Sequence, residues 1–202
     1  MSKRIKKSKD SMKKKLIGII FLCVIGIICY LLCSMQRSIK TESMKIVEII
    51  ESGNTKKLED VLLGKKDFPE DNEWIEFSNN ITDGNDGIIT KIIEESSIDV
   101  KKITKKYIVY EITAPELSDI FKEAMKEENL TNNNFEEYMY QYIAKAEKIN
   151  TEVKVEYFYE KRVFQADYLK KEFLNAITGN LITAYQELIQ EMIWEREGEN
   201  LQ

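Results

Sequence analysis

Residues 16–35 read LIGIIFLCVIGIICYLLCSM and contain no charged side chain. A helix of about 20 residues rises about 30 Å, which matches the hydrocarbon thickness of a bilayer. The segment is apolar around its whole circumference, whereas a helix on a soluble core usually has a polar face. We therefore predict a transmembrane helix that consists of Leu16, Ile17, Gly18, Ile19, Ile20, Phe21, Leu22, Cys23, Val24, Ile25, Gly26, Ile27, Ile28, Cys29, Tyr30, Leu31, Leu32, Cys33, Ser34 and Met35.

The residues before this segment are strongly basic. Residues 1–15 carry eight lysine and arginine side chains and one aspartate, a net charge of +7, and the other 22 basic and 34 acidic side chains give residues 16–202 a charge of −12. Basic flanks of a membrane span stay on the cytoplasmic side. We therefore predict a cytoplasmic tail (residues 1–15), a single pass through the cell membrane, and an extracytoplasmic C-terminal part.

The apolar segment is interpreted as a retained signal anchor, with a cleaved signal peptide as the alternative. The apolar region of a signal peptide is about 7–15 residues long and ends at an A-x-A-like site. This segment is longer, and Leu32-Cys33-Ser34 matches such a site poorly. A lipoprotein signal needs a small residue before the modified cysteine, whereas leucine or isoleucine precedes each cysteine of this segment. We expect no lipid attachment.

The composition excludes several kinds of chemistry. The chain has no histidine, so it can form neither a Ser-His-Asp triad nor a Cys-His dyad, and it offers no imidazole to zinc, copper or iron. All three cysteines lie in the apolar segment, so no disulfide holds the remaining chain together. We expect no enzyme activity, no metal and no cofactor. The charge of −12 also disfavours nucleic acid as a partner, because phosphates are repelled.

Residues 36–40 are interpreted as a short stalk and residues 41–202 as one extracytoplasmic α+β domain. Alternating apolar and polar residues predict two hairpins, at 98–113 and 153–166. Apolar residues spaced by three and four predict helices at 44–50, 56–63, 117–125, 135–146 and 169–192, whereas 88–93 is ambiguous and 65–87 irregular. A curved antiparallel sheet with helices packed on one face buries all of these apolar stripes.

Several boundaries of these helices are predicted from cap residues. Thr113-Ala114-Pro115-Glu116 has the capping hydroxyl, early proline and acid of a helix start. Asn134 and Asp167 are expected to cap the two later helices, after a polar loop at 129–134 and after the second hairpin. Gly179 is expected to weaken the last helix without ending it.

Two stretches carry a resemblance to a known family. YEITAPELSDIF (110–121) and FLNAITGNLI (173–182) are similar to the cystatin-like, or nuclear transport factor two-like, extracytoplasmic domains of membrane-anchored proteins in Gram-positive bacteria. The bias toward lysine, isoleucine and asparagine is typical of an AT-rich bacterial genome. The resemblance implies a cystatin-like fold without catalysis. It also implies a role like that of the relatives that are assembly factors of conjugation and type IV secretion machines.

Acidic residues form the first group of candidate sites. Asp83-Gly84-Asn85-Asp86-Gly87 with Glu94 resembles a calcium loop, but its fifth position is Gly87 and its sixth is Ile88, where the motif needs a ligand and a glycine. We interpret it as an ordinary turn. The carboxylate pairs at 94–95, 127–128 and 136–137 are interpreted as solvated helix faces rather than acid–base pairs.

Aromatic and apolar residues form the second group. Tyrosines 138, 140 and 142 with residues 157–159 either line a ligand cleft or pack in the core, and Tyr140 and Phe158 are expected to be exposed because they are out of phase with their neighbours. The stripe 181–194 either packs on the domain or presents Trp194 to a partner. We therefore expect a non-enzymatic protein that binds another protein during assembly of a cell-envelope complex. A small-ligand-binding extracytoplasmic receptor is the alternative.

Overall fold

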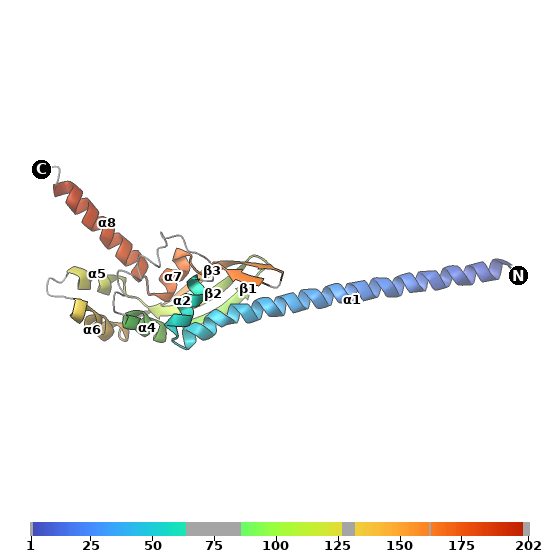
Figure 1. The fold of residues 1–202 in the computed structure, drawn as a ribbon, viewed down its shortest axis with the longest axis horizontal. Coiled ribbons are helices and arrows are strands. Elements are labelled where there is room, and N and C mark those ends of the chain that lie inside the picture. Colours follow the sequence, from blue (N-terminus) through green and yellow to red (C-terminus); the bar gives the residue numbers. More distant parts are fainter. Residues whose placement is uncertain (1, 64–85, 127–131, 162, 200–202) are drawn as a thin grey trace. The chain divides into compact units, whose positions relative to one another are not determined.

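The computed structural model describes residues 2–63, 86–126, 132–161 and 163–199 (Figure 1). The chain divides into two compact units, Met1–Thr41 and Glu42–Gln202. The predicted irregular segment 65–87 lies outside the described residues except for Asp86 and Gly87, which are helical. Of the predicted polar loop 129–134, residues 129–131 lie outside them, whereas residues 132–134 are helical, so this part of the prediction is wrong. The second unit contains the sheet and all of the helices after the first.

Helix α1 (Ser2–Glu51) is continuous and includes residues 36–40, the segment interpreted above as a stalk. Among the described residues it contains the one helix that is long and apolar enough to cross a membrane. Every side chain from 20 to 37 is exposed. A soluble surface rarely presents an apolar stretch of this size, so the first unit has the properties of a membrane-anchoring or signal helix.

Four antiparallel strands form one sheet in the order β1-β2-β3-β4. β1 (Ser97–Ile103) and β2 (Tyr107–Pro115) form the first hairpin, with an irregularity between Val100 and Lys102. β3 (Lys148–Glu160) is the longest strand, and β4 (Val163–Ala166) returns beside its second half. The first residue of β2, Tyr107, pairs with Glu156, whereas β4 pairs with residues 157–160 of β3. The β3–β4 pairing therefore lies beyond the first residue of β2. Both predicted hairpins are therefore confirmed.

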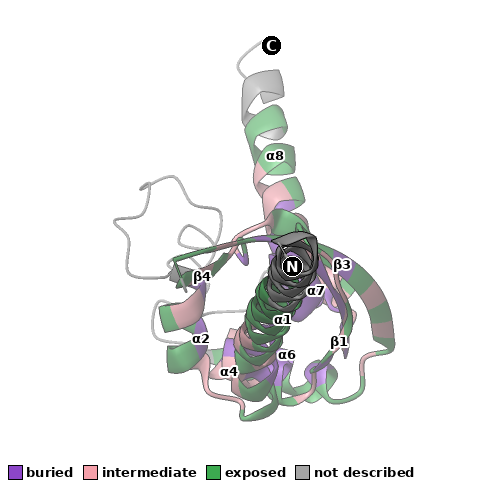
Figure 2. Cartoon of the chain, turned by 90° about the vertical axis from the view of Figure 1, so that its right-hand side faces the viewer, coloured by how far each residue is buried: buried purple, intermediate pink, exposed green. Residues whose placement is uncertain are grey.

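The two faces of the sheet differ as the alternation predicts. One face is buried and consists of Ile98, Ile108, Tyr110, Ile112, Val153 and Val155. The other face carries charged residues, among them Asp99, Glu111, Glu152 and Lys154. The strands in Figure 2 accordingly contain both buried and exposed residues. α7 (Lys171–Ile177) contacts β2 and β3, and α4 (Asp86–Glu94) contacts β2. The predicted α+β class, with an antiparallel sheet and helices packed on it, is confirmed.

The remaining helices pack on each other around this core. They are α2 (Thr55–Leu63), α5 (Ser118–Lys126), α6 (Asn132–Ile143) and α8 (Leu181–Glu199). α4 contacts α2 and α6, and α5 contacts α6 and α8. The ambiguous apolar run 88–93 lies in α4, where four of its isoleucines are buried. Asn134 lies inside α6, so its predicted role as a cap is wrong.

A buried tyrosine joins three parts of the domain. Tyr110 of β2 is fully buried, and its hydroxyl donates a hydrogen bond to the carbonyl oxygen of Ser43 in α1 at 3.2 Å. The hydroxyl of Tyr168 lies 2.9 Å from that of Tyr110. The Phe173 ring of α7 packs edge-on against Tyr110, with 5.9 Å between ring centroids. Helix, strand and the segment after β4 therefore meet at one hydroxyl group.

The predicted helix start at Thr113 is wrong. β2 continues through Pro115, which pairs with Lys148, and α5 begins only at Ser118. β1 begins at Ser97, opposite Thr113, so no β1 residue lies beside Pro115. No β1 residue therefore needs a hydrogen bond from the nitrogen of Pro115, and the proline is tolerated in the strand. The carboxylate of Glu116 supplies the cap and accepts hydrogen bonds from Ser118 N at 3.0 Å and Ser118 Oγ at 2.5 Å.

The single last helix predicted for 169–192 is also wrong, because it is two helices. Gly179 and Asn180 have φ angles of 62° and 65° and separate α7 from α8. α7 starts at Lys171 without a side-chain cap, so Asp167 does not cap it. The carbonyl oxygen of Gly179 accepts a hydrogen bond from Leu117 N at 3.0 Å. A Cβ atom on Gly179 would lie 1.9 Å from the carbonyl oxygen of Pro115.

Gly179→Ala is expected to destabilise the protein far more than Gly53→Ala. Both glycines have a left-handed φ, but a Cβ on Gly53 would meet only the flexible Glu94 side chain at 3.4 Å. The left-handed conformation costs about 1 kcal/mol in each variant, and the contact with the backbone at Gly179 raises the loss to about 3 kcal/mol. Thermal unfolding of the full chain in detergent, followed by near-ultraviolet circular dichroism, measures both. Equal losses would show that the close approach to Pro115 is unimportant.

Candidate functional site

The first half of α8 is firmly attached to the domain. Its apolar residues Leu181, Ile182, Ala184 and Leu188 are buried. Lys122 of α5 forms an ion pair with Glu187, and Nζ of Lys171 donates a hydrogen bond to Oε1 of Gln186 at 2.5 Å. The part of the predicted stripe up to Leu188 therefore packs on the domain.

The second half of α8 leaves the surface of the domain (Figure 1). Met192, Ile193 and Trp194, which we call the α8 tip, are 45%, 48% and 70% exposed. Consecutive helical residues point about 100° apart, so the α8 tip is apolar on several sides. The stripe 181–194 is thus buried in its first part and exposed from Met192 to Trp194.

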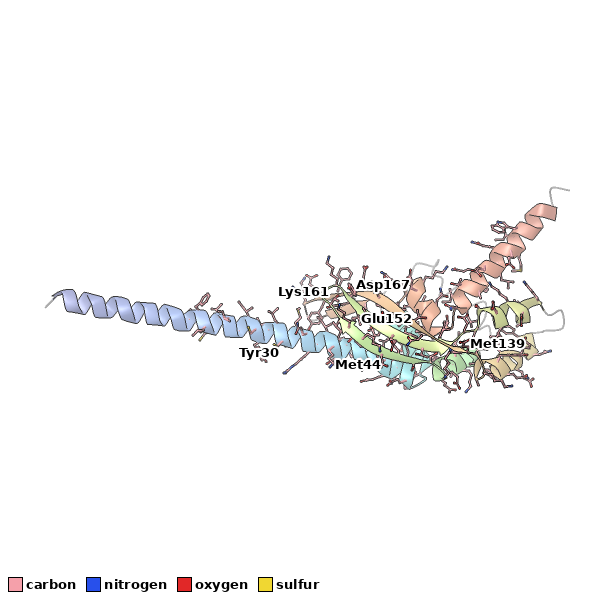
Figure 3. All side chains as sticks on the ribbon, turned by 180° about the vertical axis from the view of Figure 1, so that it is seen from behind. Tyr30, Met44, Met139, Glu152, Lys161 and Asp167 are labelled. Carbon is pink, nitrogen blue, oxygen red and sulfur yellow. The ribbon has the colours of Figure 1, made fainter. Side chains whose placement is uncertain are left out.

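The two tyrosine-rich groups do not lie together. Figure 3 shows Met139 of α6 and Lys161, in the turn between β3 and β4, at opposite ends of the domain. Tyr157 is buried, stacks on Phe164 with 5.4 Å between centroids, and donates a hydrogen bond to the carbonyl oxygen of Thr104 at 2.6 Å. The described residues therefore do not form the cleft that we considered from both groups.

The tyrosines of α6 have structural contacts. Tyr138 and Tyr142 pack with ring centroids 4.8 Å apart. The hydroxyl of Tyr140 donates a hydrogen bond to Oε1 of Glu136 at 2.6 Å. A Cβ on Gly87 of α4 would lie 1.9 Å from that hydroxyl, so Tyr140 also fills the contact between α4 and α6. Burial, and next the hydrogen bond to Glu136, raise the pKa of Tyr140 to about 12.

Phe158 is exposed, as its phase in β3 predicts, and the structure adds a neighbour that the sequence pattern did not reveal. Phe158 is 75% exposed and Val163 56%. Phe158 pairs with Gln165, and Glu160 pairs with Val163, so Phe158 and Val163 lie diagonally on one face of the β3–β4 hairpin. This second exposed apolar surface lies on the hairpin, distant in sequence from the α8 tip.

The carboxylates of Glu94 and Glu95 are engaged in ion pairs. Nζ of Lys148 donates to Oε2 of Glu95 at 3.1 Å, and this bond lowers the pKa of Glu95. Nζ of Lys91 lies 3.2 Å from Oε2 of Glu94. A carboxylate with a lowered pKa stays ionised and is a poor general acid. The pair at 127–128 lies outside the described residues.

No metal centre is formed by the residues that the structure describes. Among them, no three cysteine, aspartate or glutamate side chains are grouped as metal ligands. Of the calcium-like motif, residues 83–85 lie outside the described part, and Asp86–Glu94 is the helix α4. A calcium loop of this type needs an irregular backbone over these positions, which the helix does not provide. The predicted ordinary turn lies mostly outside the described residues.

A comparison of the chain with family models, with curated proteins and with solved structures found no match.

The buried tyrosine pair makes stability depend on alkaline pH. Burial raises the pKa of Tyr110, and it raises the pKa of Tyr168 to about 12. In the unfolded chain both ionise near pH 10, so the folded state binds more protons above this pH. The stability that these two tyrosines contribute to the folded state is therefore present in full below about pH 10 and is lost as the pH rises toward 12.

Thermal unfolding between pH 8 and about pH 11.5 tests this expectation. The native protein is expected to lose up to about 2.7 kcal/mol per pH unit above pH 10 from these two groups. The variant Tyr110→Phe/Tyr168→Phe should be about 1–2 kcal/mol less stable at neutral pH, because it loses the shared hydrogen bonds, but it should show a shallower alkaline decline. Phe173→Leu, which only alters packing, should keep the native slope. A steep decline in the double variant would contradict the assignment.

Proposed function

We propose that this protein is a non-enzymatic, single-pass membrane protein whose extracytoplasmic domain binds another protein during assembly of a cell-envelope complex. The α8 tip is the observation that carries the protein-binding role. Three consecutive apolar residues, including a tryptophan, are exposed at the end of a helix whose first half is buried. A groove or helix bundle of a partner protein is the surface that fits an apolar helix end of this kind.

The energetics favour protein binding at the α8 tip. Burying a side chain of this size contributes about 1.5–3 kcal/mol, and tryptophan is enriched among residues that dominate binding energy. The attached first half of α8, with the pairs Lys122–Glu187 and Lys171–Gln186, holds the helix in place before a partner arrives. Such preorganisation lowers the entropy lost on binding.

Two features support the membrane anchor. Helix α1 exposes apolar side chains from Ile20 onward, and it is long enough to span a bilayer. The charge of +7 on residues 1–15 supports a cytoplasmic N-terminus.

The proposed lack of catalysis rests on the absence of histidine and on the ion pairs of Glu94 and Glu95. A cystatin-like family relationship is part of the proposal. Its support is the α+β architecture with a four-stranded antiparallel sheet and helices packed against it.

Cysteine labelling tests the anchor and its orientation. The native cysteines lie within residues 16–35, so a membrane-impermeant maleimide should leave the native protein unlabelled on intact cells. Lys145→Cys, at an exposed position of the domain, is expected to label on intact cells. Ser8→Cys should label only after the membrane is permeabilised. Labelling of Ser8→Cys on intact cells would reverse the orientation, and release of the protein by alkaline carbonate would contradict the anchor.

A photo-crosslinking amino acid at position 194 tests the α8 tip. In cells that make the full chain, we expect one discrete adduct to a second protein from position 194. Position 125 is the control, because Met125 is similarly accessible, at 49% exposure, but lies on α5. We expect no adduct from this position.

Substitution gives an independent measurement of the same surface. Met192→Ser/Ile193→Ser/Trp194→Ser should reduce co-purification of that partner by roughly 30-fold or more, the loss expected of about 2 kcal/mol of binding energy. Its unfolding temperature should change little, because these side chains are exposed in the folded state. Met125→Ser should affect neither property. Unchanged co-purification of the triple variant would reject the α8 tip as the binding surface.

A further inference from the structure

The two hairpins end at the same side of the domain. The hydroxyl of Tyr157 in β3 donates a hydrogen bond to the carbonyl oxygen of Thr104, in the turn between β1 and β2. Tyr157 N donates to the carbonyl oxygen of Lys106 at 3.1 Å. We call residues 100–109 and 154–161 the hairpin end, because these bonds hold the two segments together.

The hairpin end is positively charged although the domain is acidic. It contains six lysines and two glutamates, a net charge of +4, whereas residues 16–202 together carry −12. All six lysines are exposed: Lys101, Lys102, Lys105, Lys106, Lys154 and Lys161. Lys101 forms an ion pair with Glu111 at 2.5 Å, and the ammonium of Lys154 lies 5.7 Å from the centre of the Tyr107 ring.

Exposed apolar side chains accompany these lysines. Phe158 lies within the hairpin end and is the most exposed of the large hydrophobic residues in the domain, and Val163 lies diagonally across the hairpin from it. An aromatic residue among lysines is the combination found where proteins contact a bilayer surface. The ring enters the boundary between headgroups and acyl chains, and the ammonium groups bind anionic headgroups.

The part of α1 that belongs to the second unit contacts the sheet through Ser43. Gly53, just after α1, lies beside Glu94, which precedes the start of β1 at Ser97. Ser43 contacts Tyr110, which lies nearer to the hairpin end than the start of β1 does. From Gly53 back to Ser43 the chain therefore runs toward the hairpin end. Figure 3 shows Met44 and Lys161 toward the same end of the domain, and Met139 at the other.

The length of chain between the apolar segment and the domain limits their separation. Residues 36–41 number six, and they reach about 20 Å when extended and about 9 Å as a helix. Six residues therefore keep the start of the domain within about 20 Å of the apolar segment.

We propose that the hairpin end binds the anionic lipid headgroups of the membrane in which the protein is anchored, with Phe158 and Val163 in contact with the bilayer surface. This inference rests on the proposed anchorage. Each lysine near an anionic surface strengthens binding by roughly fivefold. The tether keeps the effective concentration of the surface high, so weak contacts suffice to hold the domain on the membrane.

The test uses the full chain in lipid nanodiscs, with a photo-crosslinking amino acid at position 163. One set of discs contains phosphatidylcholine alone, and the other contains equal amounts of phosphatidylcholine and phosphatidylglycerol. Lipid adducts at position 163, counted by mass spectrometry, are expected to increase at least about fivefold in the anionic discs. A crosslinker at position 125 of α5 is expected to yield few lipid adducts in either set.

Charge reversal provides matched variants. Lys105→Glu/Lys106→Glu is expected to reduce the adducts at position 163 to the level seen in phosphatidylcholine alone. Lys126→Glu/Lys145→Glu reverses two exposed lysines outside the hairpin end, one at the end of α5 and one after α6, and should preserve the adducts. Unfolding temperatures of both variants should match the native protein, since all four side chains are exposed.

The outcomes separate this proposal from the anchorage. A chain that enters the discs but gives equal adducts with both lipid compositions overturns lipid binding and leaves the anchor standing. A chain that does not enter the discs overturns both. In intact cells, a protein adduct instead of a lipid adduct at position 163 would also overturn the proposal, because the hairpin end would then bind a protein.

Discussion

The buried hydroxyl of Tyr110 is the interaction on which the arrangement of the domain depends. A polar atom without access to water must have a hydrogen-bond partner, and the partners of this one are the carbonyl oxygen of Ser43 and the hydroxyl of Tyr168. The position of α1 on the sheet is therefore determined by a bond as well as by apolar packing.

A second constraint acts at the other end of β2. Gly179 lies so close to the carbonyl oxygen of Pro115 that there is no room for a Cβ at position 179. Asn180 adds a hydrogen bond from its amide nitrogen to Oε2 of Glu116 at 2.5 Å. These contacts force the chain to turn between α7 and α8. Without that turn the apolar stripe would continue in the direction of α7, so the turn directs α8 past the edge of the domain.

Much of the fold follows from local patterns, and the errors have a common cause. The two hairpins and α2 were predictable because alternation and helical spacing reflect burial on one face. Pro115 and Gly179 were misinterpreted because each has a conformation imposed by a partner distant in sequence. Pro115 extends a strand through its pairing with Lys148, and Gly179 ends a helix through its contact with Pro115. The run 88–93 was ambiguous, since a short apolar segment fits either structure, and its packing against β2 and α6 accompanies the helix.

The candidate surfaces also include features that local patterns predict and features that depend on contacts between distant residues. Exposure of Phe158 follows from its phase in β3, and the proposed role of Trp194 rests on its place at the end of an apolar stripe. The lysines at 101–106 and at 154–161 are separated by about 50 residues, and only the bonds of Tyr157 to the β1–β2 turn bring them together.

α8 begins next to the Pro115 end of β2, about 26 Å along the strand from Tyr107 at the hairpin end. Without the hairpin end, the remainder of residues 16–202 carries −16. The proposed lipid contact at the hairpin end and the proposed partner contact of α8 therefore start from opposite ends of β2.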